Sequence, residues 1–248
     1  MADPLVTVVI PTYNEAGNLE PLCSQLWSLP IPDLRILIVD DGSPDGTGDQ
    51  AEALSRANPG RLMVIHRSGK LGLGTAYLQG FARALQEGSD VIIQMDADFS
   101  HSPAYLPTFV AGLGQADAVF GSRYIPGGRL DDRWSTARKA LSKFGNVYAR
   151  TILGMSLRDV TGGFRVWKSA TLAAMPLDRI RSNGYVFQVE MAYVASRLGF
   201  RILELPIYFE DRKIGRSKMS FRIQLEAALR VWQVLLAHRS VERRPPAR

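Results

Sequence analysis

The sequence predicts an α/β fold in which helices flank a mostly parallel sheet. Two observations carry this prediction. In the first half of the chain, short apolar runs rich in Val and Ile alternate with longer segments of helical periodicity, and the runs end in polar residues. Such alternation builds right-handed βαβ units, whose strands lie parallel in one sheet. A chain of 248 residues that is 46% hydrophobic can bury a sizeable core for one such domain.

The first half supplies the predicted strands and helices in alternation. Strands are expected at residues 5–10, 34–39, 62–66, 91–95 and 116–120, and helices at 17–29, 47–56 and 74–87. Ligands of open α/β sheets bind beyond the carboxyl ends of the strands. The polar clusters Pro11–Glu15, Asp40–Ser43 and Asp96–Asp98 each follow a strand directly. We therefore expect these three clusters to converge on one site.

The second half is less regular. We expect a Gly- and Arg-rich loop (123–133), a helix (135–153), a glycine-containing turn (161–164), a helix (186–198), a strand (202–209) and a basic loop (211–218). The last predicted helix, 219–238, is amphipathic, with Trp232 and Leu235 on its apolar face. We predict one domain over residues 1–218, this helix packed on the domain or on a membrane surface, and a basic disordered tail over 239–248.

Charge is distributed unevenly along the chain. Residues 1–120 contain 6 Lys+Arg and 14 Asp+Glu, a balance of −8, whereas residues 121–248 contain 24 and 10, a balance of +14. A basic second half indicates an anionic partner, such as a phosphate group, a membrane surface or nucleic acid. Nucleic acid is the least favoured of these, because the basic half contains no interleaved exposed aromatics and no known binding module.

Several classes of protein are disfavoured by composition. The single cysteine, Cys23, excludes an internal disulfide and a cysteine-rich zinc site, which suits a reducing compartment. The start of the sequence has neither the basic nor the apolar segment of a signal peptide. No run of about 18 apolar residues occurs, so we expect no transmembrane helix in this chain.

Asp96 and Asp98 stand one residue apart, directly after the apolar run Val91–Met95. Carboxylates at a strand end can hold a hard divalent cation such as Mg²⁺ or Mn²⁺, and that cation can hold a diphosphate. The segment Lys70–Thr75 also opens a helix after a strand, but its glycines fit neither the P-loop nor the first-strand dinucleotide-binding pattern. The sequence thus disfavours kinases and dehydrogenases, and Lys70 is a candidate ligand of a nucleotide diphosphate.

Together, Pro11-Thr12-Tyr13-Asn14-Glu15, Asp40-Asp41-Gly42-Ser43 and Asp96-Ala97-Asp98 resemble, in order and spacing, the motifs of the inverting family 2 glycosyltransferases. Four later segments look like those of the dolichol-phosphate (polyprenol-phosphate) mannose synthases: Gly121–Tyr124, Asp159–Arg165, Gly184–Glu190 and Arg212–Lys218. The likeness covers residues 5–236. It implies the GT-A fold, a Rossmann-like sheet flanked by helices, and inverting transfer of mannose from GDP-mannose to a polyprenyl or dolichyl phosphate.

The resemblance also implies roles for individual residues. Asp98 is the expected direct metal ligand, with Asp96 beside it as a further ligand or donor contact, and the ion is Mg²⁺ or Mn²⁺. The other expected donor-binding residues are Pro11, Tyr13, Glu15, Asp41 and Lys70. Those expected to bind the acceptor phosphate are Arg123, Arg138 and Ser142, with Arg212 and Lys218 bridging it to the donor; Asp159, Gln188 and Glu190 are expected to orient groups or contact the sugar. The pattern departs at Ser100, where a related form has a metal-binding Gln.

The resemblance further implies attachment to a membrane. This chain is similar to the soluble catalytic-subunit form of these synthases, so we expect it on the cytoplasmic side of a membrane as a peripheral protein, with a small membrane-anchoring subunit as a conceivable partner. A phosphate monoester has a second pKa of about 6, so the acceptor is already largely ionised at neutral pH. No protein group is therefore required to deprotonate it. No Gln-x-x-Arg-Trp signature of processive polysaccharide synthases is present.

Three alternatives stay open at the level of sequence. The donor is UDP-glucose or another nucleotide sugar in the first. In the second, the acceptor is a hydroxyl group and Glu190 or Asp159 is its general base. In the third, the chain is an inactive subunit that binds a nucleotide sugar, which the presence of Asp96, Asp98, Arg138 and Arg212 disfavours.

Overall fold

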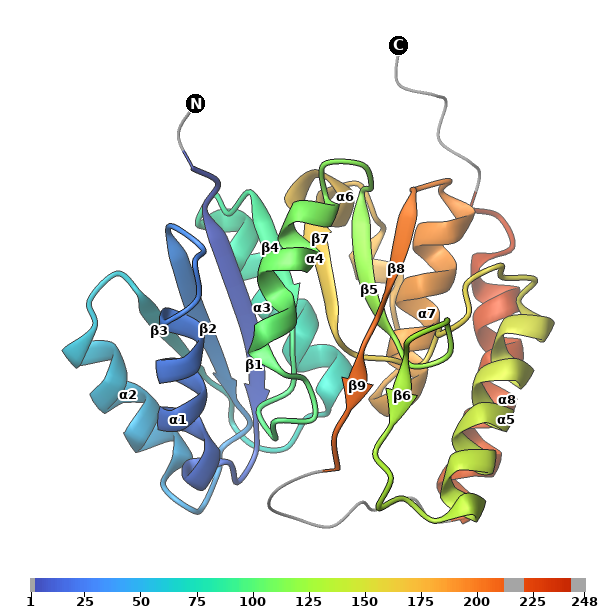
Figure 1. The fold of residues 1–248 in the computed structure, drawn as a ribbon, viewed down its shortest axis with the longest axis horizontal. Coiled ribbons are helices and arrows are strands. Elements are labelled where there is room, and N and C mark those ends of the chain that lie inside the picture. Colours follow the sequence, from blue (N-terminus) through green and yellow to red (C-terminus); the bar gives the residue numbers. More distant parts are fainter. Residues whose placement is uncertain (1–2, 212–220, 242–248) are drawn as a thin grey trace.

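The computed structural model describes residues 3–211 and 221–241. In these residues a seven-stranded sheet runs through the molecule in the order β3-β2-β1-β4-β7-β5-β8, with helices on both faces (Figure 1). Its strands are β1 (Val6–Thr12), β2 (Leu34–Asp40), β3 (Leu62–His66), β4 (Val91–Gln94), β5 (Ala118–Ser122), β7 (Arg165–Lys168) and β8 (Ile202–Pro206). All pairings are parallel except those of β7. The predicted α/β fold with a mostly parallel sheet is confirmed.

Helices cover the sheet in two layers, because side chains alternate across each strand. On one face α1 (Ala16–Trp27), α2 (Thr47–Ala57) and α4 (Leu106–Gly112) pack on strand residues such as Val8 and Ile10. On the other face α3 (Leu73–Gln86) and α7 (Gly184–Arg197) pack on residues such as Val9. Central strands such as β1 are therefore buried on both sides, which explains their unbroken apolar runs.

Two further helices lie outside α7. They are α5 (Thr136–Ile152) and α8 (Phe221–His238), which run side by side in Figure 1. Trp232 Nε1 of α8 donates to Tyr148 Oη of α5 at 2.9 Å, and Val231, Val234 and His238 of α8 are buried. The predicted amphipathic helix thus exists and packs on the domain. No helix of the described residues has the length and apolar character needed to cross a membrane.

The structure differs from the prediction in the second half. The strand predicted at 202–209 is split: β8 pairs with β5, and β9 (Tyr208–Phe209) pairs with β6 (Arg129–Leu130) in a separate small sheet. Strand β7 was not predicted; it has four residues, begins with Arg165 and ends with Lys168, so it carries no apolar alternation long enough to detect. Helices α4 and α6 (Ser169–Ala173) were also not predicted.

The carboxyl ends of the parallel strands meet at one edge of the sheet, the lower edge in Figure 1. The segments after β1, β2, β4 and β5 therefore gather there, as predicted for the polar clusters. Of the remaining predictions, the tail over 242–248 and the basic loop over 212–218 lie outside the described residues.

A substitution at Gly80 tests the packing of α3 on the sheet. A Cβ at Gly80 would overlap Cγ1 of Val9, so Gly80→Ala should lower the free energy of unfolding by about 2 kcal/mol through overpacking. Gly145 of α5 is the matched control, because a Cβ there meets no atom within 4 Å. Gly145→Ala should stabilise by about 1 kcal/mol through helix propensity. Denaturant titration measures both, and equal effects would contradict this view of the α3 interface.

Candidate active site

The turn after β2 is built by Asp40. One oxygen of its buried carboxylate accepts from Thr12 Oγ1 at 3.0 Å and from Ser43 Oγ at 2.5 Å, and the other accepts from Ser43 N at 3.0 Å. Ser43 Oγ in turn accepts from Asn14 N at 3.0 Å. The ends of β1 and β2 are thus bonded to each other, which brings the first two polar clusters together.

Asp41, which was predicted to bind the nucleotide-sugar donor, is buried and forms an ion pair with Arg67. Arg67 Nη2 also donates to Thr75 Oγ1 at 2.5 Å, and its Nη1 donates to the carbonyl oxygen of Gly72 at 3.3 Å. Arg67 therefore links the end of β2 to the segment 70–75. Arg67 was not among the predicted site residues, although Arg67 directly follows β3, as the polar clusters follow their strands.

Three other predicted donor residues lie at the same edge. Lys70 Nζ is 4.0 Å from the ring centroid of Tyr13, a cation–π contact that places the ammonium beside the segment after β1. Glu15 accepts from Asn18 Nδ2 at 2.7 Å, and its backbone N–H donates to Thr47 Oγ1 at 2.9 Å. Pro11 lies near the end of β1, next to these groups. The residues predicted to bind the nucleotide therefore lie at one edge of the sheet.

The two carboxylates after β4 are held in a tight loop. Asp96 accepts from Oη of the fully buried Tyr77 at 2.7 Å, and its backbone N–H donates to His101 Nδ1 at 3.1 Å. Asp98 is 5% exposed and accepts from Ser100 N at 3.0 Å. Tyr77 was not predicted, because on an amphipathic helix it is indistinguishable from a core residue.

These residues fit a divalent metal ion that shares its ligands with a substrate. Within the described part of the chain no group of three or more His, Cys, Asp or Glu side chains is placed to bind a metal. Mg²⁺ and similar ions are often bound by only one or two carboxylates, with phosphate oxygens and water as the other ligands. Ser100 Oγ, close to Asp98 in the chain, is buried and has no hydrogen-bond partner among the residues that the structure describes. Asp96, Asp98 and this spare hydroxyl make a suitable donor set.

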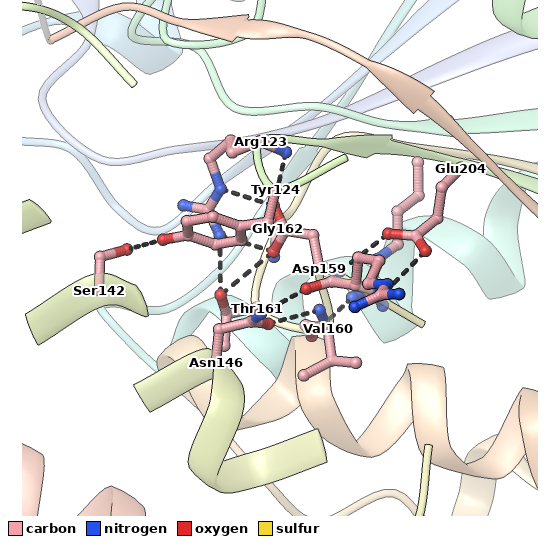
Figure 2. A network of polar contacts seen from close by, with 11 residues as sticks. Arg123, Tyr124, Ser142, Asn146, Asp159, Val160, Thr161, Gly162 and Glu204 are labelled. Carbon is pink, nitrogen blue, oxygen red and sulfur yellow. Dashed lines mark hydrogen bonds and ion pairs between the residues drawn. The ribbon is translucent and has the colours of Figure 1, made fainter. Parts of the chain in front are cut away.

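Directly after β5, a buried ion pair joins Arg123 and Asp159 (Figure 2). Arg123 Nε and Nη2 donate to the carboxylate at 2.7 and 2.8 Å, and its backbone N–H donates at 2.9 Å. Thr161 Oγ1 and Gly162 N also donate to the same carboxylate. Burial alone would raise the pKa of Asp159, but the charge and hydrogen bonds of Arg123 hold it below its usual value. Arg123 Nη1 has no partner among the described residues.

Arg138 and Ser142 lie one turn apart on α5. The guanidinium of Arg138 stacks 3.6 Å from the ring centroid of Trp134 and pairs with Asp211 at 3.1 Å, and its side chain is 34% exposed. Ser142 Oγ shares a hydrogen bond of 2.7 Å with Tyr124 Oη, and Tyr124 directly follows Arg123. The predicted acceptor-phosphate residues are therefore gathered. Arg212 and Lys218 lie outside the described residues.

Helix α7 presents Gln188 and Glu190. Gln188 Oε1 accepts from Gln94 Nε2 of β4 at 2.5 Å, which ties α7 to the strand before the acidic loop. Both oxygens of Glu190 are occupied: Oε2 accepts from the backbone N–H groups of Ser182 and Arg181 at 2.7 and 3.2 Å, and Oε1 lies 2.7 Å from His238 Nε2 of α8. A sugar contact by Glu190 would have to be made beside these bonds, at a residue that is only 2% exposed.

Neither Asp159 nor Glu190 has the pKa of a good general base. Burial alone would raise the pKa of Glu190, yet the hydrogen bonds from His238 and Ser182 hold it below its usual value. A general base acts best with a pKa near the working pH. Both carboxylates are therefore poorly suited to deprotonate a hydroxyl acceptor.

Arg165 is a further site residue whose importance the sequence did not show. Its side chain is fully buried, 4.2 Å from the Phe120 ring centroid, and Nη2 donates to the carbonyl oxygen of Val160 at 3.1 Å. Its Nε and Nη1 have no hydrogen-bond partner within residues 3–211 and 221–241. Burial lowers the pKa of Arg165 to about 9, against the opposing effect of Asp159. Asp159 therefore lies in the field of two arginines.

Residues 7–172 match the model of glycosyl transferase family 2. The chain belongs to this family. An undecaprenyl-phosphate mannosyltransferase from Micrococcus luteus is 46% identical over 234 residues, which cover 94% of this chain and 95% of that protein. A polyprenol monophosphomannose synthase from Mycolicibacterium smegmatis is 44% identical over 225 residues, which cover 90% of this chain and 84% of that protein. The resemblance stated from the motifs is thus confirmed, and this glycosyltransferase is an enzyme of the family-2 class.

Solved structures of low sequence identity share the fold of this family 2 glycosyltransferase. A mannosyltransferase from Pyrobaculum calidifontis, in complex with GDP-Man and Mn²⁺, has a TM-score of 0.65 at 20% identity, covering 99% of this chain and 67% of that one. Glucosyl-3-phosphoglycerate synthase from Mycobacterium tuberculosis, in complex with Mn²⁺ and UDP, has a TM-score of 0.64 at 18% identity, covering 94% and 79%. The GT-A-like fold is confirmed, and it accommodates a divalent metal ion.

The contacts of Glu190 lead to a prediction about stability. Because the folded state lowers the pKa of Glu190, its contribution is fully present above the unfolded value of 4.5 and is lost as the pH falls through the folded value. Glu190→Gln should therefore cost about 2 kcal/mol near neutral pH and progressively less below about pH 4. Denaturant titration across pH measures this difference.

Glu20→Gln on the exposed face of α1 is the control for that experiment, since Glu20 has no partner in the described structure and should show no such dependence. A pH-independent cost for Glu190→Gln would mean that the carboxylate charge is not what stabilises this position.

Proposed function

We propose that this glycosyltransferase transfers mannose from GDP-mannose to a polyprenyl phosphate, with inversion, to give a β-linked polyprenyl phosphate mannose. One observation carries the proposal: the carboxylates of Asp96 and Asp98 and the cationic groups of Arg123 and Arg138 lie at the same end of the sheet, in a chain 46% identical to an undecaprenyl-phosphate mannosyltransferase. Acidic groups on one side suit a metal-bound diphosphate, and basic groups on the other suit a phosphate nucleophile.

The nucleotide-sugar donor is assigned to the part of the sheet edge that residues from the first half of the chain form. Pro11, Tyr13, Glu15 and Asp41 line the position of the nucleoside, and Lys70 reaches its diphosphate. Asp98 and Asp96 would hold Mg²⁺ or Mn²⁺, which when bound neutralises charge on the departing nucleoside diphosphate. Asp96 is oriented for this by the hydrogen bond from Tyr77, and the Arg67–Asp41 ion pair fixes the segment that carries Lys70.

The acceptor phosphate is assigned to the part of the sheet edge that residues from the second half of the chain form. Arg138, Ser142 and Nη1 of Arg123, which has no partner among the described residues, would bind the phosphate, with Arg212 and Lys218 bridging it to the donor. A phosphate monoester is largely dianionic at neutral pH, because its second pKa is near about 6. It can attack the anomeric carbon without a general base, so positioning and neutralisation of charge carry the reaction. The occupied, low-pKa carboxylates of Asp159 and Glu190 support this acceptor over a hydroxyl group.

A lipid acceptor also requires an approach to the membrane. Helices α5 and α8 expose large apolar side chains on neighbouring surfaces, with exposed fractions of 66% for Phe144, 48% for Trp232 and 61% for both Leu229 and Leu236. Apolar side chains on helices that also carry Lys and Arg are typical of proteins that lie on a bilayer surface. We assign this surface to peripheral attachment on the cytoplasmic side, or to binding of a membrane-anchoring subunit.

The direct test is a transfer assay. Purified protein is incubated with Mg²⁺ or Mn²⁺, polyprenyl phosphate and radiolabelled GDP-mannose, in parallel with UDP-glucose, and the lipid product is extracted into organic solvent. We expect label in the organic phase from GDP-mannose, and its loss when the metal is chelated. Transfer from UDP-glucose alone, or label that stays in the aqueous phase, would overturn the proposal.

Two substitutions separate the roles of the two sides. Asp98→Asn should lower kcat by roughly 100-fold or more, because it removes charge from the metal site. Arg138→Gln should raise the KM for polyprenyl phosphate about tenfold, because one phosphate contact is lost. The control is Asp178→Asn, an exposed carboxylate without a partner in the described structure. Unfolding temperatures equal to that of the parent would show that the effects are local, and parent-like kinetics from either variant would defeat its assignment.

A further inference from the structure

A cavity of about 250 Å³ opens beside Tyr124, on a face of α5 that adjoins the one carrying Arg138 and Ser142. Its lining residues are Tyr124, Lys143, Asn146, Val147, Arg150 and Arg158. Because a water molecule occupies about 30 Å³ of the liquid, this volume holds a small hydrated ion or headgroup.

Three cationic side chains line the cavity. Lys143, Asn146, Val147 and Arg150 stand at positions i, i+3, i+4 and i+7 of α5, so they share one face of that helix. Arg158 belongs to the segment after α5 and approaches the same space from the other side. The spacing on the helix and the return of the chain together place two guanidinium groups and one ammonium around a single cavity.

These cations have no counterion in the part of the chain that the structure describes. Lys143, Arg150 and Arg158 form no side-chain hydrogen bond or ion pair there. Two carboxylates beside Arg158 are already occupied: Glu204 accepts from the backbone N–H groups of Arg158 and Asp159 at 2.7 and 2.8 Å, and Asp159, the next residue in the chain, is bound by Arg123. Like charges gathered without a partner disfavour the folded state, and an anion that binds them relieves this repulsion.

The floor of the cavity is fixed before any ligand binds. Asn146 is 2% exposed; its Oδ1 accepts from Val160 N at 2.8 Å and its Nδ2 donates to the carbonyl oxygen of Arg158 (Figure 2). The backbone that carries Arg158 is thereby bonded to α5 and to Glu204. Tyr124 Oη is held by Ser142 Oγ at 2.7 Å. A cavity whose walls are held by such contacts loses little entropy when a ligand binds.

We propose that this cavity binds a phosphate group distinct from the acceptor phosphate. Two Arg forks and a Lys point charge are the side chains that proteins use for phosphate oxygens. Tyr124 stands between the two positions, since its hydroxyl is bonded to Ser142, the residue assigned to the acceptor phosphate. The rim carries exposed apolar side chains, Val147 at 46% and Phe144 at 66%. A phosphate delivered by an anionic lipid headgroup and a free phosphate ion share this chemistry.

Binding is tested without donor or metal, so the result is independent of the proposed reaction. The probes are inorganic phosphate, measured by calorimetry, and vesicles of phosphatidylcholine with and without phosphatidylglycerol, measured by flotation. The test variant is the double substitution Arg150→Gln and Arg158→Gln. The control is Arg129→Gln with Lys139→Gln, which removes the same charge from the same half of the chain, at residues whose ion pairs with the exposed Asp132 are 3.8 and 3.9 Å long. Arg129 also lies over the ring of Tyr208, and Lys139 Nζ donates to the carbonyl oxygen of Asp132 at 3.5 Å.

We expect the Arg150→Gln, Arg158→Gln protein to bind its probe roughly 30-fold more weakly, which corresponds to about 1 kcal/mol for each arginine, while the control changes little. Weakened binding of phosphatidylglycerol vesicles alone assigns the site to a lipid headgroup, and weakened binding of inorganic phosphate assigns it to the free ion. Equal losses in both double variants, or no binding of either probe to the parent, would overturn the proposal.

A second readout guards against confusion with the acceptor site. In the transfer assay with detergent-solubilised polyprenyl phosphate, the Arg150→Gln, Arg158→Gln protein should keep the parent KM for that substrate. A raised KM would show that the cavity belongs to the acceptor phosphate, and the inference of a second site would fail. Thermal unfolding of each variant confirms that the comparison is made between folded proteins.

Discussion

The buried ion pair between Arg123 and Asp159 is the contact on which the second half of the site depends. Taking both charges out of water is costly, and the cost is offset only because Asp159 accepts from several donors at once, among them Arg123 N, Thr161 Oγ1 and Gly162 N. These bonds connect the end of β5 to the turn that starts β7. The antiparallel strand, the glycine turn and the acceptor side of the site are therefore fixed together.

This pair also constrains the chemistry. With its carboxylate bound by Arg123 and its pKa held low, Asp159 is an anchor and not a proton acceptor. The proposed phosphate acceptor arrives already ionised and needs no proton acceptor, whereas a hydroxyl group does. The opposite charges of the two halves of the sequence fit this proposal: we assign the metal and donor side to the acidic half, and the groups that suit an anionic acceptor to the basic half.

Much of the fold could be predicted because central parallel strands such as β1 and β2 are buried on both faces and read as unbroken apolar runs. Strand β7 escaped prediction because its four residues, which begin with Arg165 and end with Lys168, show no such pattern. The gathering of Pro11–Glu15, Asp40–Ser43 and Asp96–Asp98 at one edge followed from where their strands end. The bonds of Glu190 did not, because its partner His238 is distant in sequence and only the packing of α8 on α7 brings them together.

In the proposed reaction, an ionised phosphate attacks the anomeric carbon of the sugar from the face opposite the departing nucleoside diphosphate. No covalent intermediate forms on the protein. The most direct measurement is the anomeric configuration of the mannosyl phosphate product, read by NMR from the coupling at the anomeric carbon. Direct displacement on the α-linked donor predicts a β-linked product. An α-linked product would contradict the account, because it requires either two displacements or attack from the same face.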